Sequence, residues 1–119
     1  MGDQSVIVEG VEHSDSPASF YSTVHGAGRV MGRAQAKGKV SKQGVVTRDP
    51  LVTLVMMQKW LQESFGGVIL RGGGVDESPH CYKRLPEVLA QQSGIKVLHT
   101  LTPIGVCMAG AGEFDPYKD

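Results

Sequence analysis

The sequence predicts an α+β fold in one segment, residues 1–119, with no internal boundary. Three observations predict this class. Helix-forming and strand-forming stretches interleave along the chain, the 119 residues suffice for one domain, and no internal repeat occurs. Sixteen glycines, about twice the usual share, gather in "GAGR", "GG" and "RGGG". Clustered glycines beside charges favour backbone that turns tightly or approaches a ligand.

Five stretches are rich in β-branched or aromatic residues and are expected to be extended: residues 5–10, 20–24, 45–47, 67–74 and 95–110. The first ends at a glycine, and the fourth predicts a buried strand that runs into a glycine loop. Pro103 cannot donate to a ladder, so it predicts an edge or a bulge in the last stretch. A polar tail, residues 113–119, follows.

Three stretches carry helix-forming patterns: residues 29–38, 50–67 and 84–94. The second is the clearest, because its apolar residues form a broad stripe. Asp49 suits its N-cap, Pro50 its first turn and Gly66 its C-terminal cap. The third is expected to stop at Gly94.

The charges and cysteines exclude several classes of protein. Lys and Arg number 12, as do Asp and Glu, so no global charge points to nucleic acid or to a membrane. No apolar run has the length of a membrane span, and "GDQS" after Met1 is unlike a signal peptide, so we expect a cytoplasmic protein. Cys81 and Cys107 lack zinc-site spacing and are expected to be reduced thiols. No metal site is therefore expected within the chain.

The stretch "STVHGAGRVMGR", residues 22–33, is the strongest candidate for chemistry. A glycine-rich turn before a helix presents backbone N–H groups to an anion. Arg29, Arg33 and Lys37 are spaced by four, so they are expected on one helix face, and arginine suits phosphate. His25 would then be a neutral nucleophile near pH 7. The alternative is a histidine that merely satisfies a backbone group at a turn.

Two other nucleotide-binding loops fit poorly. The glycines read G-A-G-R-V-M-G, which departs from the dinucleotide fingerprint, and no G-K-[ST] of a phosphate-binding Walker loop occurs. A second candidate stretch is "RGGGVDESPHCYK", residues 71–83. Asp76 and Glu77 are either functional carboxylates or part of a polar loop with a helix cap, and Tyr82 beside Lys83 suits stacking on a planar ligand.

Three segments, "MGDQSVIVEG", "FYSTVHGAGRVMGRAQA" and "GVILRGGGVDESPHCYKRLPEVL", resemble in order and spacing the C-terminal part of the RtcB family of RNA ligases. "HGAGR" is the most specific motif, and DE-x-P-x-x-YK is the second. The resemblance covers nearly the whole chain but only about the last quarter of a typical member. It implies tRNA splicing or RNA repair, in which RNA 3′-phosphate or 2′,3′-cyclic phosphate ends are joined to 5′-hydroxyl ends with GTP and Mn²⁺.

The resemblance also implies roles for individual residues. His25 corresponds to the nucleophile that attacks the α-phosphate of GTP and becomes guanylylated. The residues that correspond to nucleotide contacts are Ser5, Gly26, Ala27, Gly28 and Tyr82. Among them, Ser5 corresponds to a guanine contact and Tyr82 to the aromatic residue packed on the guanine, where stacking is worth about 1–3 kcal/mol. Arg29 and Arg33 resemble the positions that meet phosphate.

The chain departs from the family pattern in three ways. The family's manganese ligands lie upstream of this segment, so Mn²⁺ is expected to be bound outside this chain. Members usually read P-G-S-M-G where this chain starts at the methionine. Members commonly end in V-K-G, whose lysine touches the guanine; here "VCMAG" puts Met108 or Ala109 at that position, and Lys118 is the candidate substitute.

Three functional hypotheses remain open. In the first, the chain supplies the nucleophile and guanylate pocket of an RNA ligase, is inactive alone, and has RNA (tRNA halves or broken RNA) and an N-terminal complementing segment as partners. In the second, it is a non-catalytic, self-associating binding or assembly module that retains the fold, with a homo-oligomer as its functional form. In the third, it is a general nucleotide-binding domain that uses "HGAGR" only as a cradle.

Overall fold

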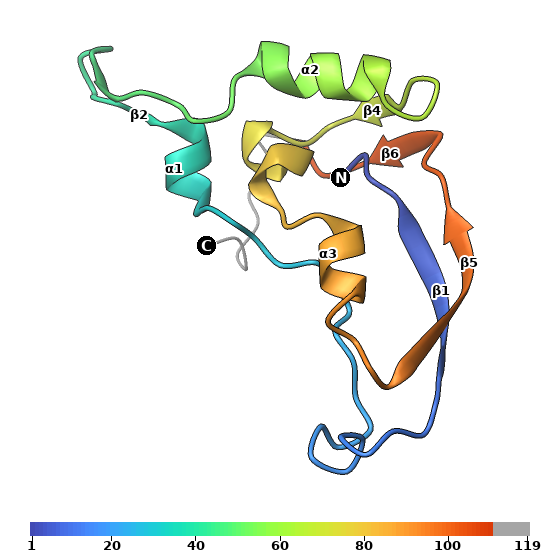
Figure 1. The fold of residues 1–119 in the computed structure, drawn as a ribbon. Coiled ribbons are helices and arrows are strands. Elements are labelled where there is room, and N and C mark those ends of the chain that lie inside the picture. Colours follow the sequence, from blue (N-terminus) through green and yellow to red (C-terminus); the bar gives the residue numbers. More distant parts are fainter. Residues whose placement is uncertain (111–119) are drawn as a thin grey trace.

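The computed structural model describes residues 1–110, in which helices and strands alternate around three two-stranded sheets (Figure 1). The strands are β1 (Ser5–Gly10), β2 (Lys39–Val40), β3 (Val46–Arg48), β4 (Ile69–Arg71), β5 (Ile95–Leu101) and β6 (Gly105–Cys107). The helices are α1 (Arg33–Lys37), α2 (Leu54–Glu63) and α3 (Leu85–Leu89), with two 3₁₀ turns, η1 (Val75–Glu77) and η2 (Pro79–Cys81). The α+β prediction is confirmed. None of the helices in this part of the chain has the length and apolar character to cross a membrane.

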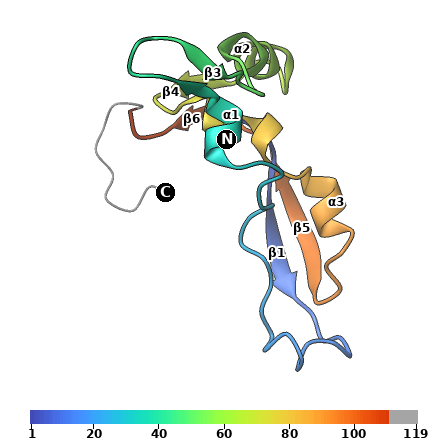
Figure 2. The same cartoon turned by 90° about the vertical axis from the view of Figure 1, so that its left-hand side faces the viewer.

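The longest sheet is an antiparallel ribbon of β1 and β5. Ser5 lies opposite Leu101 and Gly10 opposite Ile95, and the register shifts after Ile7. Figure 2 shows this ribbon extending away from the part of the molecule that holds α1, α2, β4 and β6, with α3 beside it. The ribbon leaves apolar side chains exposed: Ile7, Val97, Leu98 and Leu101. A two-stranded ribbon needs further packing to be stable in water, so we expect these side chains to pack against another surface.

The predicted strand over residues 95–110 is divided in two. β5 pairs with β1, whereas β6 pairs in parallel with β4, so the chain changes partner at Pro103. Proline has no N–H for a ladder, which is why the break falls there. The prediction of a buried strand before the glycine loop is wrong for Ile69, which is exposed, while Leu70 is half-buried against the core.

Gly72 is the position where an added methyl group is expected to do most damage. Its φ is +72°, and an added Cβ would lie 1.9 Å from the carbonyl oxygen of Met108. Left-handed backbone costs an alanine about 1–2 kcal/mol, and overpacking adds about 1–3 kcal/mol. We therefore expect Gly72→Ala to lower the free energy of unfolding by about 2–5 kcal/mol in urea titrations followed by circular dichroism. Gly10→Ala is the control, since a Cβ there meets nothing within 4 Å; equal losses in both variants would contradict this account.

Helix α2 starts later than the sequence predicts. The N-cap is Thr53, whose Oγ1 accepts a hydrogen bond from the amide of Met56 at 3.2 Å, so the prediction of Asp49 as the cap is wrong. The preceding amides, those of Leu51 and Val52, donate instead to carbonyls at the end of α1. This backbone pairing keeps the chain extended until Thr53. The helix ends at Glu63, a turn before the predicted Gly66.

Helix α1 is also shorter than predicted, because the residues before it pair with a distant segment. The amide of Val30 donates to the carbonyl of Cys81 at 2.8 Å, and Arg29 forms a β-bridge with Tyr82. The helix therefore starts at Arg33, and the prediction that Arg29 shares a helix face with Arg33 and Lys37 is wrong. A glycine-rich turn feeding directly into a helix N-terminus is accordingly not the geometry of this site.

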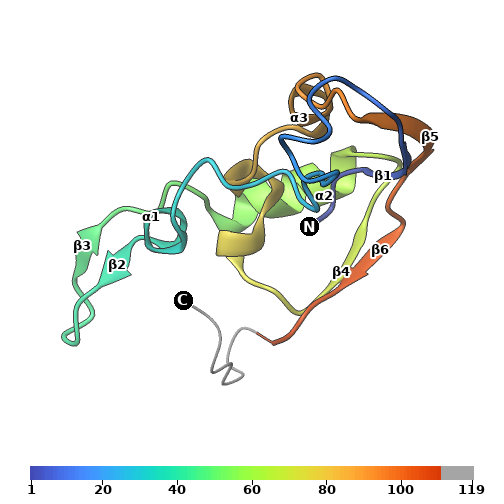
Figure 3. The ribbon, with the colours of Figure 1, turned by 90° about the horizontal axis from the view of Figure 1, so that it is seen from below.

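Three local predictions need smaller corrections. Helix α3 ends at Leu89, well before Gly94. The strand predicted over 45–47 is β3, shifted by one residue, and it forms a hairpin with β2 that projects from one end of the molecule (Figure 3). Phe20 and Tyr21 have φ of 54° and form a turn, so the predicted extended approach is wrong for these residues.

The buried hydrophobic side chains form two small clusters. One joins α1 to η2 through Ala36, Val52 and Cys81. The other, Met57, Leu61 and Val68, packs under α2 against Leu70 and Val106. The radius of gyration is 17.1 Å, whereas a compact domain of this length has about 13–14 Å. The fold is thus open, with little core for its length.

Candidate functional site

One cavity of about 760 Å³ brings together segments from across the chain. Its walls come from the start of β1, the loop before α1, the segment from η2 to α3, and the connection between β5 and β6. Five residues that the sequence predicts for the site line this cavity: Ser5, His25, Gly26, Ala27 and Tyr82. Its volume lies within the range of small-molecule sites in proteins. These five residues therefore share one space large enough for a nucleotide.

The loop that carries His25 is fixed by backbone pairing on its C-terminal side. His25 lies exposed in a bend, and Gly28 follows with φ of +79°, a conformation that favours glycine. The carbonyl of Gly28 accepts a hydrogen bond from the amide of Lys83 at 2.9 Å. Gly28 does not line the cavity itself, but this bond ties the histidine loop to the segment that carries Tyr82. The two sequence motifs are thus held side by side.

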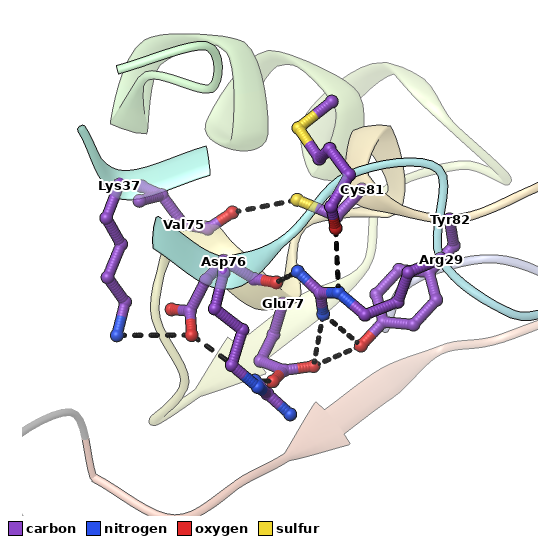
Figure 4. A network of polar contacts seen from close by, with 9 residues as sticks. Arg29, Lys37, Val75, Asp76, Glu77, Cys81 and Tyr82 are labelled. Atoms are coloured by element: carbon purple, nitrogen blue, oxygen red, sulfur yellow. Dashed lines mark hydrogen bonds and ion pairs between the residues drawn. The ribbon is translucent and has the colours of Figure 1, made fainter. Parts of the chain in front are cut away.

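Arg29 connects the two motifs through its side chain (Figure 4). Its guanidinium donates to the Tyr82 hydroxyl at 2.9 Å and to the main-chain carbonyl of Asp76 at 2.7 Å. It also lies over the Tyr82 ring, 4.9 Å from the ring centroid, which is a cation–π arrangement. One face of this aromatic ring is therefore covered by Arg29, and the ring is held in place through its hydroxyl.

Two carboxylates, those of Asp76 and Glu77, form ion pairs with the positively charged side chains of this region. Arg33 pairs with Asp76 at 3.3 Å and also with Glu77, and Lys37 pairs with Asp76 at 3.1 Å. Glu77 accepts a hydrogen bond from the Tyr82 hydroxyl and lies 3.9 Å from Arg29. We call these six residues the carboxylate network: Arg29, Arg33, Lys37, Asp76, Glu77 and Tyr82. Three cations thus face two carboxylates. Figure 4 labels two of these cations, Arg29 and Lys37, with both carboxylates.

Asp76 is the buried centre of the carboxylate network, with 1% of its side chain exposed. Burial alone raises its pKa, but hydrogen bonds, including those from Lys37 and Arg33, and the charge of Lys37 outweigh burial and hold the pKa below its usual value. Its Oδ1 atom is buried without a hydrogen-bond partner among residues 1–110. Asp76 is therefore an ionised structural anchor.

The network shows what sequence reasoning missed. Asp76 and Glu77 are buried ion-pair partners and not a solvated loop or a helix cap. The available signal was the four-residue spacing of Arg33 and Lys37 together with two adjacent carboxylates. Arg29 and Arg33 are engaged by these carboxylates, and their contact with phosphate stays a prediction.

Cys81 and His80 lie outside the cavity and make local contacts. Cys81 is buried, its Sγ lies 3.5 Å from the carbonyl of Val75, and burial raises the pKa of its thiol. Cys81 and Cys107 are both free cysteines. His80 contacts the Ser78 hydroxyl at 2.9 Å and the edge of Trp60. No three His, Cys, Asp or Glu side chains among residues 1–110 come together to hold a metal ion, so these residues do not fit a manganese centre.

The end of the described chain runs beside β4. The amide of Met108 donates to the carbonyl of Arg71 at 2.8 Å, and the carbonyl of Ala109 accepts from Gly73 at 2.9 Å. Neither Met108 nor Ala109 lines the cavity. Lys118, the candidate substitute for the family's tail lysine, lies outside the described residues.

Comparison with known proteins places the chain in a family. The model of that family, described as tRNA-splicing ligase RtcB, matches residues 1–109. The RNA-splicing ligase RtcB of Mycobacterium tuberculosis is 35% identical over 117 residues, covering 92% of this chain and 23% of that protein. The Escherichia coli RNA-splicing ligase RtcB is 33% identical over 111 residues with the same coverage. The chain thus spans about a quarter of the length of these relatives. No solved structure matches it. With most of its length matched by the family model and these relatives aligned along 92% of it, the chain belongs to the RtcB family.

Proposed function

We propose that this chain supplies the histidine nucleophile and the guanylate pocket of a GTP-dependent RNA ligase. The enzyme joins RNA 3′-phosphate or 2′,3′-cyclic phosphate ends to 5′-hydroxyl ends, in tRNA splicing or RNA repair. The observation that carries the proposal is the cavity, because Ser5, His25 and Tyr82 line it from separate segments. Family membership supports the same assignment, since the relatives are named RNA-splicing ligases.

The residues of the cavity have distinct tasks in this proposal. A ring nitrogen of His25 attacks the α-phosphorus of GTP, a nitrogen–phosphorus bond forms, and pyrophosphate leaves with the electron pair of the broken phosphorus–oxygen bond. The guanylyl group then passes to an oxygen of the RNA 3′-phosphate as the nitrogen–phosphorus bond breaks; a 2′,3′-cyclic phosphate must first be opened by water to give that 3′-phosphate. The 5′-hydroxyl then attacks the phosphorus of the activated 3′-phosphate, loses its proton and displaces GMP. Ser5 contacts the guanine, and Tyr82 stacks on it with the ring face that Arg29 leaves open. Gly26 and Ala27 bring backbone close to the nucleotide.

The cofactors of the proposal are GTP and Mn²⁺. The cavity volume and the small residues of the histidine loop suit GTP. The described residues do not fit manganese, so in the proposal its ligands lie on a polypeptide outside this chain. Manganese would offset the charge that develops on the phosphates.

Labelling with radioactive GTP tests the proposal. The chain is incubated with GTP labelled at the α-phosphate and Mn²⁺, with and without a polypeptide that carries the remaining length of an RtcB relative. We expect covalent label on the chain only when that complement is present, because the complement brings the metal ligands. Label on the chain alone would contradict the division of the site, and no label in either mixture would contradict the proposed function.

A second candidate is a self-associating assembly module without catalysis, which the exposed apolar side chains favour. Besides the β1–β5 ribbon, the hairpin of β2 and β3 and the outer face of α2 expose apolar residues: Val40, Val45, Val46, Leu54 and Val55. Large exposed apolar patches mark interfaces. In the ligase proposal the remaining length of the enzyme covers them, whereas in this alternative a second copy of the chain does.

Light scattering separates these two candidates. A self-associating module forms dimers or larger species that persist when the complement is added. The ligase proposal expects the complement to displace self-association and form a one-to-one complex. A chain that remains monomeric and binds no complement would contradict both interface assignments.

A further inference from the structure

One lysine, Lys83, lines the cavity that contains His25. No other Lys or Arg among residues 1–110 lines this cavity. The arginines expected to meet phosphate, Arg29 and Arg33, are held by Asp76 and Glu77 in the carboxylate network. A phosphate drawn to those arginines would have to compete with carboxylates that are already in place.

Lys83 is differently placed. It forms no ion pair with another residue among 1–110, and its side chain is exposed. Its amide donates to the carbonyl of Gly28 at 2.9 Å, so its backbone is fixed beside the loop that carries His25. Tyr82, its neighbour, lines the same cavity. The ammonium group of lysine is a mobile point charge on a four-carbon stem, which allows it to follow a phosphate.

We propose that Lys83 is a phosphate-binding residue of the nucleotide site, and that Arg29 and Arg33 act on the nucleotide only through their hold on Tyr82 and on the histidine loop. This inference rests on the proposed nucleotide pocket and adds the cation that the pocket needs. The phosphates of GTP carry several negative charges, and a hydrogen bond from an ammonium group to one of them is stronger than a neutral bond. The lysine side chain thereby separates nucleotides from nucleosides.

Isothermal titration of the chain with guanosine, GMP and GTP tests the inference. Lys83→Met keeps the length and apolar stem of the side chain but removes its charge. We expect the Kd for GMP and GTP to rise about 10- to 100-fold, since a hydrogen bond to a charged group is lost, while the Kd for guanosine stays unchanged. Lys83→Arg should restore most of the affinity. Lys59→Met is the matched control, because Lys59 is exposed on α2 and does not line the cavity.

The outcomes distinguish this inference from the proposed function. If wild-type chain binds GMP and Lys83→Met binds it equally well, the lysine does not hold the phosphate and the inference is overturned alone. If Lys83→Met weakens guanosine as much as GMP, the lysine shapes the pocket and the inference is again overturned. If wild-type chain binds none of the three compounds, the proposed pocket falls and the inference falls with it.

Discussion

Replacement of His25 by alanine is expected to reduce transfer of the guanylyl group to the chain by a factor of at least about 1,000, measured with labelled GTP, Mn²⁺ and the complementing polypeptide. Removal of a covalent nucleophile costs factors of this size or more, because no other group can form the intermediate. His25 lines the cavity in an exposed bend, so its loss changes little in the packing. Thermal unfolding of the variant should therefore match that of the wild-type chain.

His99→Ala is the matched control for this prediction. His99 lies on β5 opposite Ile7, is exposed, and does not line the cavity. We expect it to retain wild-type labelling. The phosphorus–nitrogen bond of a guanylylated histidine is labile in acid and stable in alkali. The label should therefore be released from the chain by acid and retained in alkali. Full labelling of His25→Ala, or an acid-stable label, would remove His25 as the acceptor.

The elements that follow from local sequence were predicted most successfully. The strand over residues 5–10 and the existence of α2 follow from composition and apolar spacing, and both are present. The ends of helices were predicted less well, since they depend on distant partners. Asp49 and Pro50 have the right chemistry for a helix start, but the amides of Leu51 and Val52 pair with α1 and delay the helix to Thr53.

The candidate site shows the same difference between features that can be predicted from the sequence and features that depend on distant partners. The resemblance led to Ser5, His25 and Tyr82, and the structure brings all three to one cavity. It gave no partner for Asp76 or Glu77, because Arg33, which pairs with both, lies 43 residues from Asp76 and 44 residues from Glu77 in the sequence. Contacts of that separation depend on the tertiary fold, which local propensity does not encode. The bridge between Arg29 and Tyr82 arises in the same way, since helix propensity alone favours a helix at Arg29.

Asp76→Asn is expected to lower the free energy of unfolding by about 2–3 kcal/mol at pH 7. Loss of one partner of a buried ion pair costs about 3–5 kcal/mol. We expect a smaller loss for Asp76→Asn than for a fully buried pair, because the side chains of Arg33 and Lys37 are 33% and 47% exposed and are hydrated when the carboxylate is lost. Urea titration measures the change, and Glu63→Gln, at an exposed residue that ends α2, is the control.

The pH dependence of that loss identifies its cause. The pKa of Asp76 in the folded chain lies below its usual value of 3.8, so its charge stabilises the fold fully above that value. The stabilisation then disappears as the pH falls through the lower, folded-state pKa. The wild-type chain should therefore lose its advantage over Asp76→Asn below about pH 4, and the two unfolding free energies should converge in stronger acid. A gap that stays constant from pH 7 into strong acid would mean that shape and not charge makes Asp76 important. Because Asp76→Asn keeps the main-chain carbonyl that Arg29 binds, its effect on stability can be separated from any effect on the Tyr82 ring.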